Sequence, residues 1–326
     1  MNTKNRTSSK PRSVPKAYFA FGFGILALGF SAIFVRAADA PGTVTAFYRM
    51  AIGSALVVLP FLNQARREPV SQKKGAIWLA ILGGVFFGLD LSFWSTGIVM
   101  SGASIPTLMA NTAPVWVGLG ALFIFREKQR KNFWVGLLVA MVGAAIILGQ
   151  DFSLAANIGI GSALGLCAAV FYGAYYLVTQ RARAHVRTLP YFWITTTSSA
   201  VFLFVVNFIF GHSLIDYDKS TYLNFLGIGV LVQVFGWLAI NYAQGFFSAP
   251  IIAATLLAQP VLTAILAWLF FGEAFTPWQI IGGIAVIGGV YLVHRSRTGI
   301  GEKPSPVSGP SPSDGKRTAK ALKTLD

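Results

Sequence analysis

Charged residues and cysteine are scarce in this sequence. Only 11% of the 326 residues are charged, about half the fraction that soluble domains carry. Of the charged residues, 26 are basic and 11 are acidic. Cys167 is the one cysteine, so the chain cannot form an intrachain disulfide. A nucleotide-binding loop is also missing, because Gly159-x-Gly161 follows no predicted strand. These deficits argue against an ordinary soluble domain, a disulfide scaffold and an ATP-driven pump.

Hydrophobic residues, by contrast, make up 55% of the sequence. Apolar runs of about 18 residues or more recur along the whole chain, and each is long enough to cross a bilayer as a helix. The first run resembles a signal peptide, since basic residues precede it and Ala38-Asp39-Ala40 follows it. Its apolar part is longer than a signal core and more spans follow, so we expect an uncleaved first helix. The pattern predicts an all-α, multi-pass membrane protein.

The apolar runs predict ten transmembrane helices between two tails. The tails, residues 1–16 and 295–326, are basic and rich in polar residues, and we expect them to be disordered. The ten helices are predicted at about residues 17–36, 43–62, 75–99, 103–125, 132–149, 157–180, 189–210, 222–245, 250–271 and 277–294. Thr276 is the expected N-cap of the last helix, with Pro277 at its first position.

The basic residues predict the orientation. With ten spans, both tails share one side with the second, fourth, sixth and eighth loops, and 23 of the 26 Lys and Arg residues fall there. The exceptions are Arg36, Arg49 and Lys219. Positively charged loops stay in the cytoplasm, so we expect a cytoplasmic (inner) membrane protein with both termini inside. Loop topology accounts for the high pI, and no nucleic-acid partner is expected.

The second half of the chain repeats the first. An offset of 146 residues, without a gap, aligns Pro114 with Pro260, Val115 with Val261, Glu127 with Glu273, Gly136 with Gly282 and Gly143 with Gly289. The repeats, residues 17–149 and 157–294, each contain five predicted spans. Because five is odd, the halves must insert with opposite topology. Inverted repeats are typical of secondary transporters, whose solute site lies near the midplane between the halves.

These motifs carry a family resemblance. Ala110–Val115 and Phe125–Glu127, then Leu256–Val261 and Gly272–Glu273, resemble the ends of two EamA-type repeats of the drug/metabolite transporter superfamily, and Ala46–Arg49 resembles the start of the family's second helix. The first repeat departs from the pattern by its basic hinge, and helices six and seven match less well. The resemblance implies ten helices, cytoplasmic termini, a central cavity and transport, often export, of small metabolites such as amino acids.

Asp90 is the strongest candidate site residue. It is predicted about ten residues inside the third helix, roughly 15 Å deep. A carboxylate at that depth must face a cavity or find a partner. In one interpretation Asp90 titrates or binds a substrate amine. In the other, Asp90 forms a buried structural pair with Arg49 of the second helix.

Aromatic and amide residues form a second group of candidates. Trp94 lies one turn beyond Asp90, and the eighth helix carries a similar ridge. We expect both ridges to line a cavity for a small amphipathic solute, although packing between helices is the alternative. Tyr172, Tyr175 and Tyr176 carry less weight. The eighth-helix residues singled out as substrate-binding are Gln233, Trp237, Asn241 and Tyr242.

The helix-breaking prolines and hinge glutamates complete the set. Asn111 and Gln259 flank Pro114 and Pro260, and each amide either satisfies the carbonyl that its proline frees or contacts substrate. Glu127 and Glu273 are expected to hold backbone amides at helix starts in structural or gating roles.

Together these features predict a secondary transporter, and not an enzyme. It would export small organic metabolites, amino acids or related compounds, by alternating access, without a cofactor or metal, and driven by a proton or other solute gradient. A polytopic enzyme acting on lipids is one alternative, but His185, His212 and His294 are scattered and no HExxH or HxxxD spacing occurs. A non-transporting scaffold is the other, and the intramembrane Asp90 argues against it.

Overall fold

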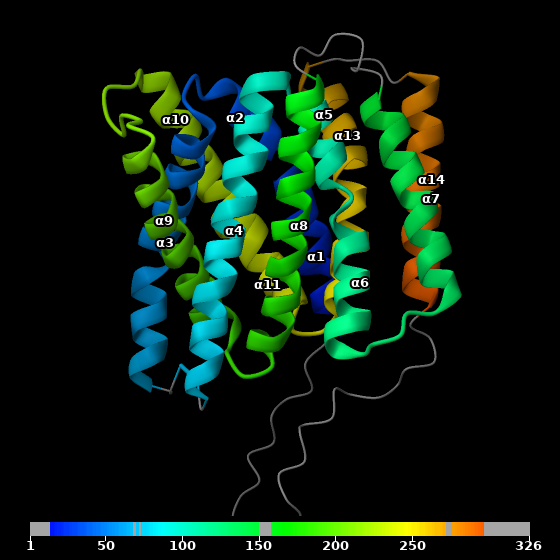
Figure 1. Ribbon diagram of the computed structural model, residues 1–326, viewed down its shortest axis with the longest axis horizontal. Coiled ribbons are helices and arrows are strands. Elements are labelled where there is room, and N and C mark those ends of the chain that lie inside the picture. The colour runs from blue at the N-terminus through cyan, green and yellow to red at the C-terminus, as the bar shows by residue number, and fades with distance from the viewer. Residues whose placement is uncertain (1–13, 68–69, 72, 150–157, 272–275, 297–326) are drawn as a thin grey trace, which may run out of the picture.

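The computed structural model describes residues 14–67, 70–71, 73–149, 158–271 and 276–296. Within these residues ten helical spans are long and apolar enough to cross a membrane, and they stand side by side in Figure 1. In chain order the helices are α1 (Val14–Gly29), α2 (Ser31–Ala37), α3 (Gly42–Arg67), α4 (Lys74–Ser101), α5 (Ser104–Ala110), α6 (Ala113–Phe125), α7 (Lys131–Leu148), α8 (Ile158–Arg183), α9 (Thr188–Ile209), α10 (Lys219–Gly227), the π-helix η2 (Ile228–Trp237), α11 (Leu238–Ala243), α12 (Ala249–Thr255), the 3-10 turn η3 (Leu256–Ala258), α13 (Gln259–Phe271) and α14 (Pro277–Arg295).

The predicted spans agree with these helices to within a few residues. The first helix begins at Val14, so the predicted tail 1–16 ends slightly too late. Residues 1–13 and 297–326, and with them most of both predicted tails, lie outside the described residues, as does Glu273. The predicted start of the last helix is confirmed, because Thr276 Oγ1 accepts from the Gln279 amide at 3.2 Å and Pro277 follows at the first helical position.

Four spans, the first, fourth, eighth and ninth, are not continuous α-helices. The fourth span breaks between α5 and α6, and the ninth tightens into a 3-10 turn between α12 and α13. Pro114 and Pro260 are each the second residue of the helix that follows the break. Proline lacks an N–H and fits the first turn of a helix, where no intrahelical bond is lost. The repeated proline therefore breaks two spans at equivalent points.

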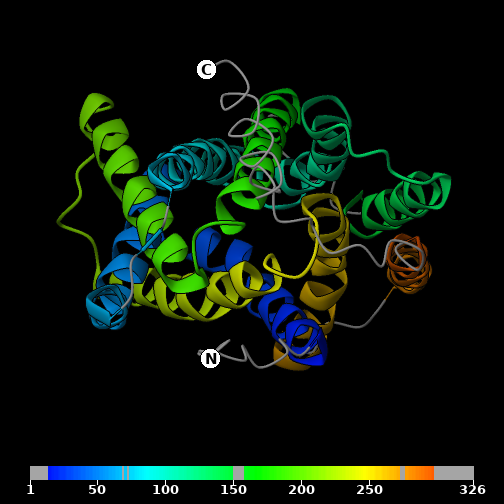
Figure 2. The same cartoon turned by 90° about the horizontal axis from the view of Figure 1, so that it is seen from below.

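The contact between α7 and α14 shows the inverted symmetry directly. The two helices run antiparallel at one edge of the molecule (Figures 1 and 2), and four glycines bring their backbones together. A Cβ on Gly289 would lie 2.5 Å from the Gly136 oxygen, and one on Gly143 would lie 2.6 Å from the Gly282 oxygen. The 146-residue offset relates Gly136 to Gly282 and Gly143 to Gly289, so the two contacts are equivalent, as in a two-fold interface.

The other helices also pair across the two halves. The third span, α4, packs along α8, the sixth span. The inverted repeat relates this contact to the one between the first span, α1, and the eighth span, η2 with α11. The second span, α3, packs against its own counterpart α9. The centre of the molecule is therefore enclosed by helices of both repeats (Figure 2).

Adding one methyl group at the α7–α14 contact should destabilise the protein. The Gly289→Ala Cβ would meet backbone atoms of Gly136 and Ala140 at 2.5 Å, so the helices must separate. Overpacking of this kind costs about 1–3 kcal/mol. We expect the thermal unfolding midpoint of the detergent-purified protein to fall by several degrees.

The neighbouring Gly288 provides the matched control. It is exposed, and a Cβ there meets nothing within 4 Å. Gly288→Ala should leave the unfolding midpoint unchanged or raise it, because alanine favours a helix more than glycine does. Equal midpoints for the two variants would contradict the close contact.

Candidate functional site

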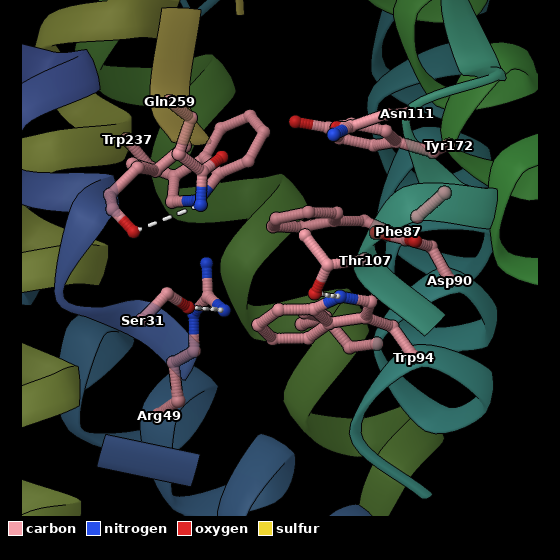
Figure 3. A pocket seen from close by; sticks show the side chains of 13 residues that line it. Ser31, Arg49, Phe87, Asp90, Trp94, Thr107, Asn111, Tyr172, Trp237 and Gln259 are labelled. Atoms are coloured by element: carbon pink, nitrogen blue, oxygen red, sulfur yellow. Dashed lines mark hydrogen bonds between the residues drawn. The ribbon is translucent and has the colours of Figure 1, made fainter. Parts of the chain in front are cut away.

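A central cavity of about 60 Å³ lies between the two halves of the molecule. That volume is enough for several water molecules. The first repeat contributes α1 to α5, and the second contributes α8, η2 and α13. Figure 3 shows Arg49, Ser31, Gln259 and Trp237 on one side of the cavity, and Asp90, Trp94, Tyr172 and Asn111 on the other.

Arg49 reaches this cavity from α3 and is only 3% exposed. Its Nε donates to Gln233 Oε1 at 3.0 Å, and its Nη1 donates to Ser31 Oγ at 3.3 Å. Gln233 in turn donates to Thr196 Oγ1 at 3.3 Å. The guanidinium carbon also lies 5.8 Å from the centre of the Phe87 ring. These neutral oxygens and the ring fix the guanidinium group and leave its charge unneutralised.

Asp90 reaches the same cavity from α4 and is 6% exposed. In the described part of the chain no side chain or backbone group donates a hydrogen bond to its carboxylate, and its oxygens lie more than 4.0 Å from the Arg49 nitrogens. The buried pair considered from the sequence is therefore not a direct ion pair. Instead, two opposite charges face one cavity across a short gap.

Aromatic rings form the walls between these charges. Trp94 donates from Nε1 to Thr107 Oγ1 of α5 at 3.1 Å. The Trp237 ring packs edge-on against Phe87, with ring centres 4.6 Å apart. The Tyr172 hydroxyl accepts a hydrogen bond from Tyr176 at 2.7 Å, so its own hydrogen remains available. The cavity is therefore apolar on its walls and charged at two points.

The two amides at the helix breaks behave differently from one another. Gln259 Nε2 donates to the backbone oxygen of Leu28 in α1 at 3.1 Å. The Leu256 carbonyl, which Pro260 leaves without its helical donor, accepts instead from the Gln259 backbone N–H. Asn111 lines the cavity, and its Nδ2 has no hydrogen-bond partner within the described residues. Gln259 thus links the ninth span to the first, whereas the Nδ2 donor of Asn111 has no acceptor among the described residues.

Five of the eight predicted substrate-binding residues line this cavity: Asp90, Trp94, Asn111, Trp237 and Gln259. The other three do not. Gln233 is 1% exposed behind Arg49, and Asn241 is 3% exposed and donates to the Trp237 carbonyl at 2.9 Å. The Tyr242 ring packs on Phe246 with centres 5.1 Å apart. The π-helix η2 changes the spacing between Gln233 and Trp237 from that of a regular α-helix. Asn241 and Tyr242 follow in the α-helix α11, beyond the part of the eighth span that lines the cavity.

Several cavity residues were not predicted. Phe87 is one turn before Asp90, so helical spacing from the carboxylate could have identified it. Thr107 is one turn before Asn111 and could have been found in the same way. Ser31 follows the break between α1 and α2, where Gly29 ends the first helix and no proline occurs.

Glu127 lies away from the cavity, on the face that carries the basic loops at Arg126–Lys131 and Arg181–Arg187. We call it the basic face. Its Oε1 accepts from Gln180 Nε2 of α8 at 2.8 Å, and Gln180 Oε1 accepts from the backbone amide of Ala249 at 2.7 Å. Ala249 is the first residue of α12. Among the described residues, Glu127 therefore reaches a helix-start amide through Gln180, and not directly as expected.

A larger depression, of about 820 Å³, opens on the opposite face. We call it the vestibule, and its lining includes Val35, Arg36, Asp39, Ile98 and His212. Ile98 lies one turn beyond Trp94 on α4, so only about one helical turn separates the vestibule from the central cavity along this helix.

Known proteins resemble this chain over most of its length. The pseudopaline exporter CntI of Pseudomonas aeruginosa is 28% identical over 266 residues, which is 80% of this chain and 89% of that protein. The uncharacterized transporter YdfC of Bacillus subtilis is 24% identical over 76% of this chain and 80% of its own. A protein named as a probable terminal-alkyne amino-acid exporter of Streptantibioticus cattleyicolor is 26% identical over 60% of this chain and 66% of its own.

The fold is also known from a solved structure. A crystal structure superposes with a TM-score of 0.72 and 18% identity, covering 86% of this chain and 98% of the other. The model of the EamA-like transporter family matches residues 15–149 and again residues 159–295. The two matches together span most of the chain, with one in each half. This chain therefore belongs to the EamA-like transporter family.

Proposed function

We propose that the protein is a secondary transporter that exports small organic metabolites, amino acids or related compounds, across the cytoplasmic membrane. The observation that carries this proposal is the central cavity, which both inverted halves enclose and which holds Asp90 and Arg49 among aromatic walls, with no ion pair between them. A carboxylate and a guanidinium group inside a membrane protein are costly and are retained for function. A solute site at the interface of inverted repeats is the arrangement expected of a secondary transporter.

The names of the relatives support export in particular. One is named as an exporter of pseudopaline and another as a probable exporter of a terminal-alkyne amino acid. The second of these names specifies an amino acid as the solute. The basic residues support cytoplasmic termini, because the loops that carry Arg66, Arg126–Lys131 and Arg181–Arg187 lie on the face where α1 begins and α14 ends.

Alternating access requires a closure on each face, and the two faces of this molecule differ. On the basic face, Gln180 bridges Glu127 to the start of α12. The 146-residue offset places Phe34 at the position of Gln180 and Ala103 at that of Ala249. The opposite face thus has an apolar residue where the basic face has a hydrogen-bonded bridge. We infer that the Gln180 bridge holds the basic face closed while the solute exchanges with the vestibule.

The breaks in the fourth and ninth spans would serve as hinges. Each lies beside the cavity, with Asn111 at one and Gln259 at the other. A broken helix can bend there without losing regular hydrogen bonds. Transport would be driven by a gradient of the solute or of a proton, with no nucleotide involved.

Liposomes containing the purified protein should take up labelled amino acids faster than empty liposomes. The measurement is counterflow, in which unlabelled solute inside the liposome drives accumulation of labelled solute. Uptake should saturate, because each protein molecule offers a limited number of solute sites. Flat uptake for all amino acids, nucleosides and sugars tried, with protein that unfolds cooperatively, would contradict transport.

Gln180→Leu should favour opening of the basic face. It removes two hydrogen bonds, each worth about 1 kcal/mol, so the ratio of closed to open molecules at the basic face should fall roughly tenfold or more. The measurement is the alkylation rate of Asn111→Cys, in a Cys167→Ser background, by a membrane-impermeant maleimide applied to the basic face. We expect a rate increase of about tenfold.

Gln129→Leu is the matched control for this experiment. Gln129 donates to the Glu127 backbone oxygen at 3.4 Å and lies outside the bridge to α12. The control should label at the rate of the parent protein. If Gln180→Leu and Gln129→Leu label equally fast, the bridge does not close the basic face.

A further inference from the structure

We propose that the central cavity selects dipolar solutes, with the solute carboxylate held by Arg49 and the solute ammonium held by Asp90. This inference rests on the proposed transport function and deepens it by naming the charge pattern that the site recognises. It also makes Asp90 and Arg49 specificity-determining residues, each for one end of the solute.

Arg49 has spare capacity for an anion. A guanidinium group carries five N–H donors. In the described residues only Nε and Nη1 find acceptors, and both acceptors are neutral oxygens of Gln233 and Ser31. These contacts orient the planar group without neutralising it. Its Nη2 is left for a ligand, and a carboxylate is the group that matches a guanidinium in charge and geometry.

Two more donors beside the cavity favour an acceptor-rich solute. Asn111 Nδ2 and Trp237 Nε1 are both buried without a partner among the described residues. Both residues line the cavity, one from the break in the fourth span and one from η2. Buried donors of this kind are normally satisfied, so each unpaired one indicates a missing partner. Solute oxygens or water would supply it.

Asp90 needs the opposite kind of partner. The residue is only 6% exposed, and its carboxylate accepts no hydrogen bond within the described part of the protein. A buried anion without donors is strongly disfavoured. A solute ammonium offers three N–H donors and a full positive charge. The rings of Phe87 and Trp94 beside it can add cation–π attraction.

The two charges together exclude solutes that carry only one. A simple carboxylate would satisfy Arg49 and leave Asp90 without a partner, and a simple amine would do the reverse. Breaking a buried charge pair by removing one partner is costly because the other charge stays buried and uncompensated. A dipolar solute, in contrast, satisfies both groups and adds no net charge to the site. Its remaining part would lie against the aromatic walls.

The test compares matched solutes by binding. The amino acid that most raises the thermal unfolding midpoint of the detergent-purified protein is chosen first, and its deaminated and decarboxylated counterparts are then titrated in the same assay. For leucine these counterparts are isocaproate and isoamylamine. We expect each single-charge counterpart to bind at least about tenfold more weakly than the parent amino acid, because it forfeits one charge-assisted contact. Equal binding of either counterpart would overturn the proposal.

Substitutions then assign each end of the solute. Asp90→Asn should reduce the preference for the amino acid over its deaminated counterpart at least about tenfold, whereas Asp90→Glu should retain the preference. Asp216→Asn is the matched control, since it removes an exposed aspartate that lines neither the central cavity nor the vestibule and should change nothing. An unchanged preference in Asp90→Asn would overturn the role of Asp90. If Asp90→Asn fails to fold, the comparison of solutes on the parent protein still decides the proposal.

The binding comparison and the counterflow measurement distinguish a failure of dipolar selection from a failure of transport. If the parent protein transports metabolites of other charge patterns and binds no amino acid, the dipolar selection is wrong and the transport function stands. If the folded protein moves no solute in counterflow, the proposed function itself fails.

Discussion

An odd number of membrane spans in a duplicated unit is the constraint on which this structure depends. Five spans return the chain to the opposite side of the bilayer, so the second copy must be inverted. The antiparallel α7–α14 contact follows from this, with Gly136 against Gly289 and Gly282 against Gly143. The inversion also places one proline break from each half beside the central cavity. Two copies of one unit thereby build a single enclosed site.

Polar groups inside that site are tolerated because they do not face lipid. The interior of a bilayer cannot hydrate a guanidinium or a carboxylate, so these groups must face protein or a cavity. Arg49 is held by the side chains of Ser31 and Gln233, which come from different halves of the chain. Asp90 has no such support among the described residues. The Arg49 guanidinium is therefore held in place before a solute binds, whereas the Asp90 carboxylate obtains its partner from the solute, as we propose.

Much of the fold could be predicted from the sequence, and part of the site. Hydropathy located all ten spans, and the offset that aligns Pro114 with Pro260 predicted the duplication. Asp90 was identifiable because a charged residue stands out inside an apolar run. Trp94 was identifiable because it lies one helical turn beyond Asp90. Asn241 and Tyr242 were misplaced because the cavity does not extend along the eighth span beyond Trp237. Ser31 and Gln180 could not be predicted, since their roles depend on helices distant in sequence.

The central claim is that the two halves open the cavity to one face at a time. Distances between spin labels, measured by double electron–electron resonance, test it most directly. One exposed pair, Met100 and Ser213, reports on the vestibule face, and another, Lys128 and Arg187, reports on the basic face. The account predicts that adding or removing solute lengthens one distance while it shortens the other. Two distances that stay fixed, or that rise and fall together, would contradict alternating access through this cavity.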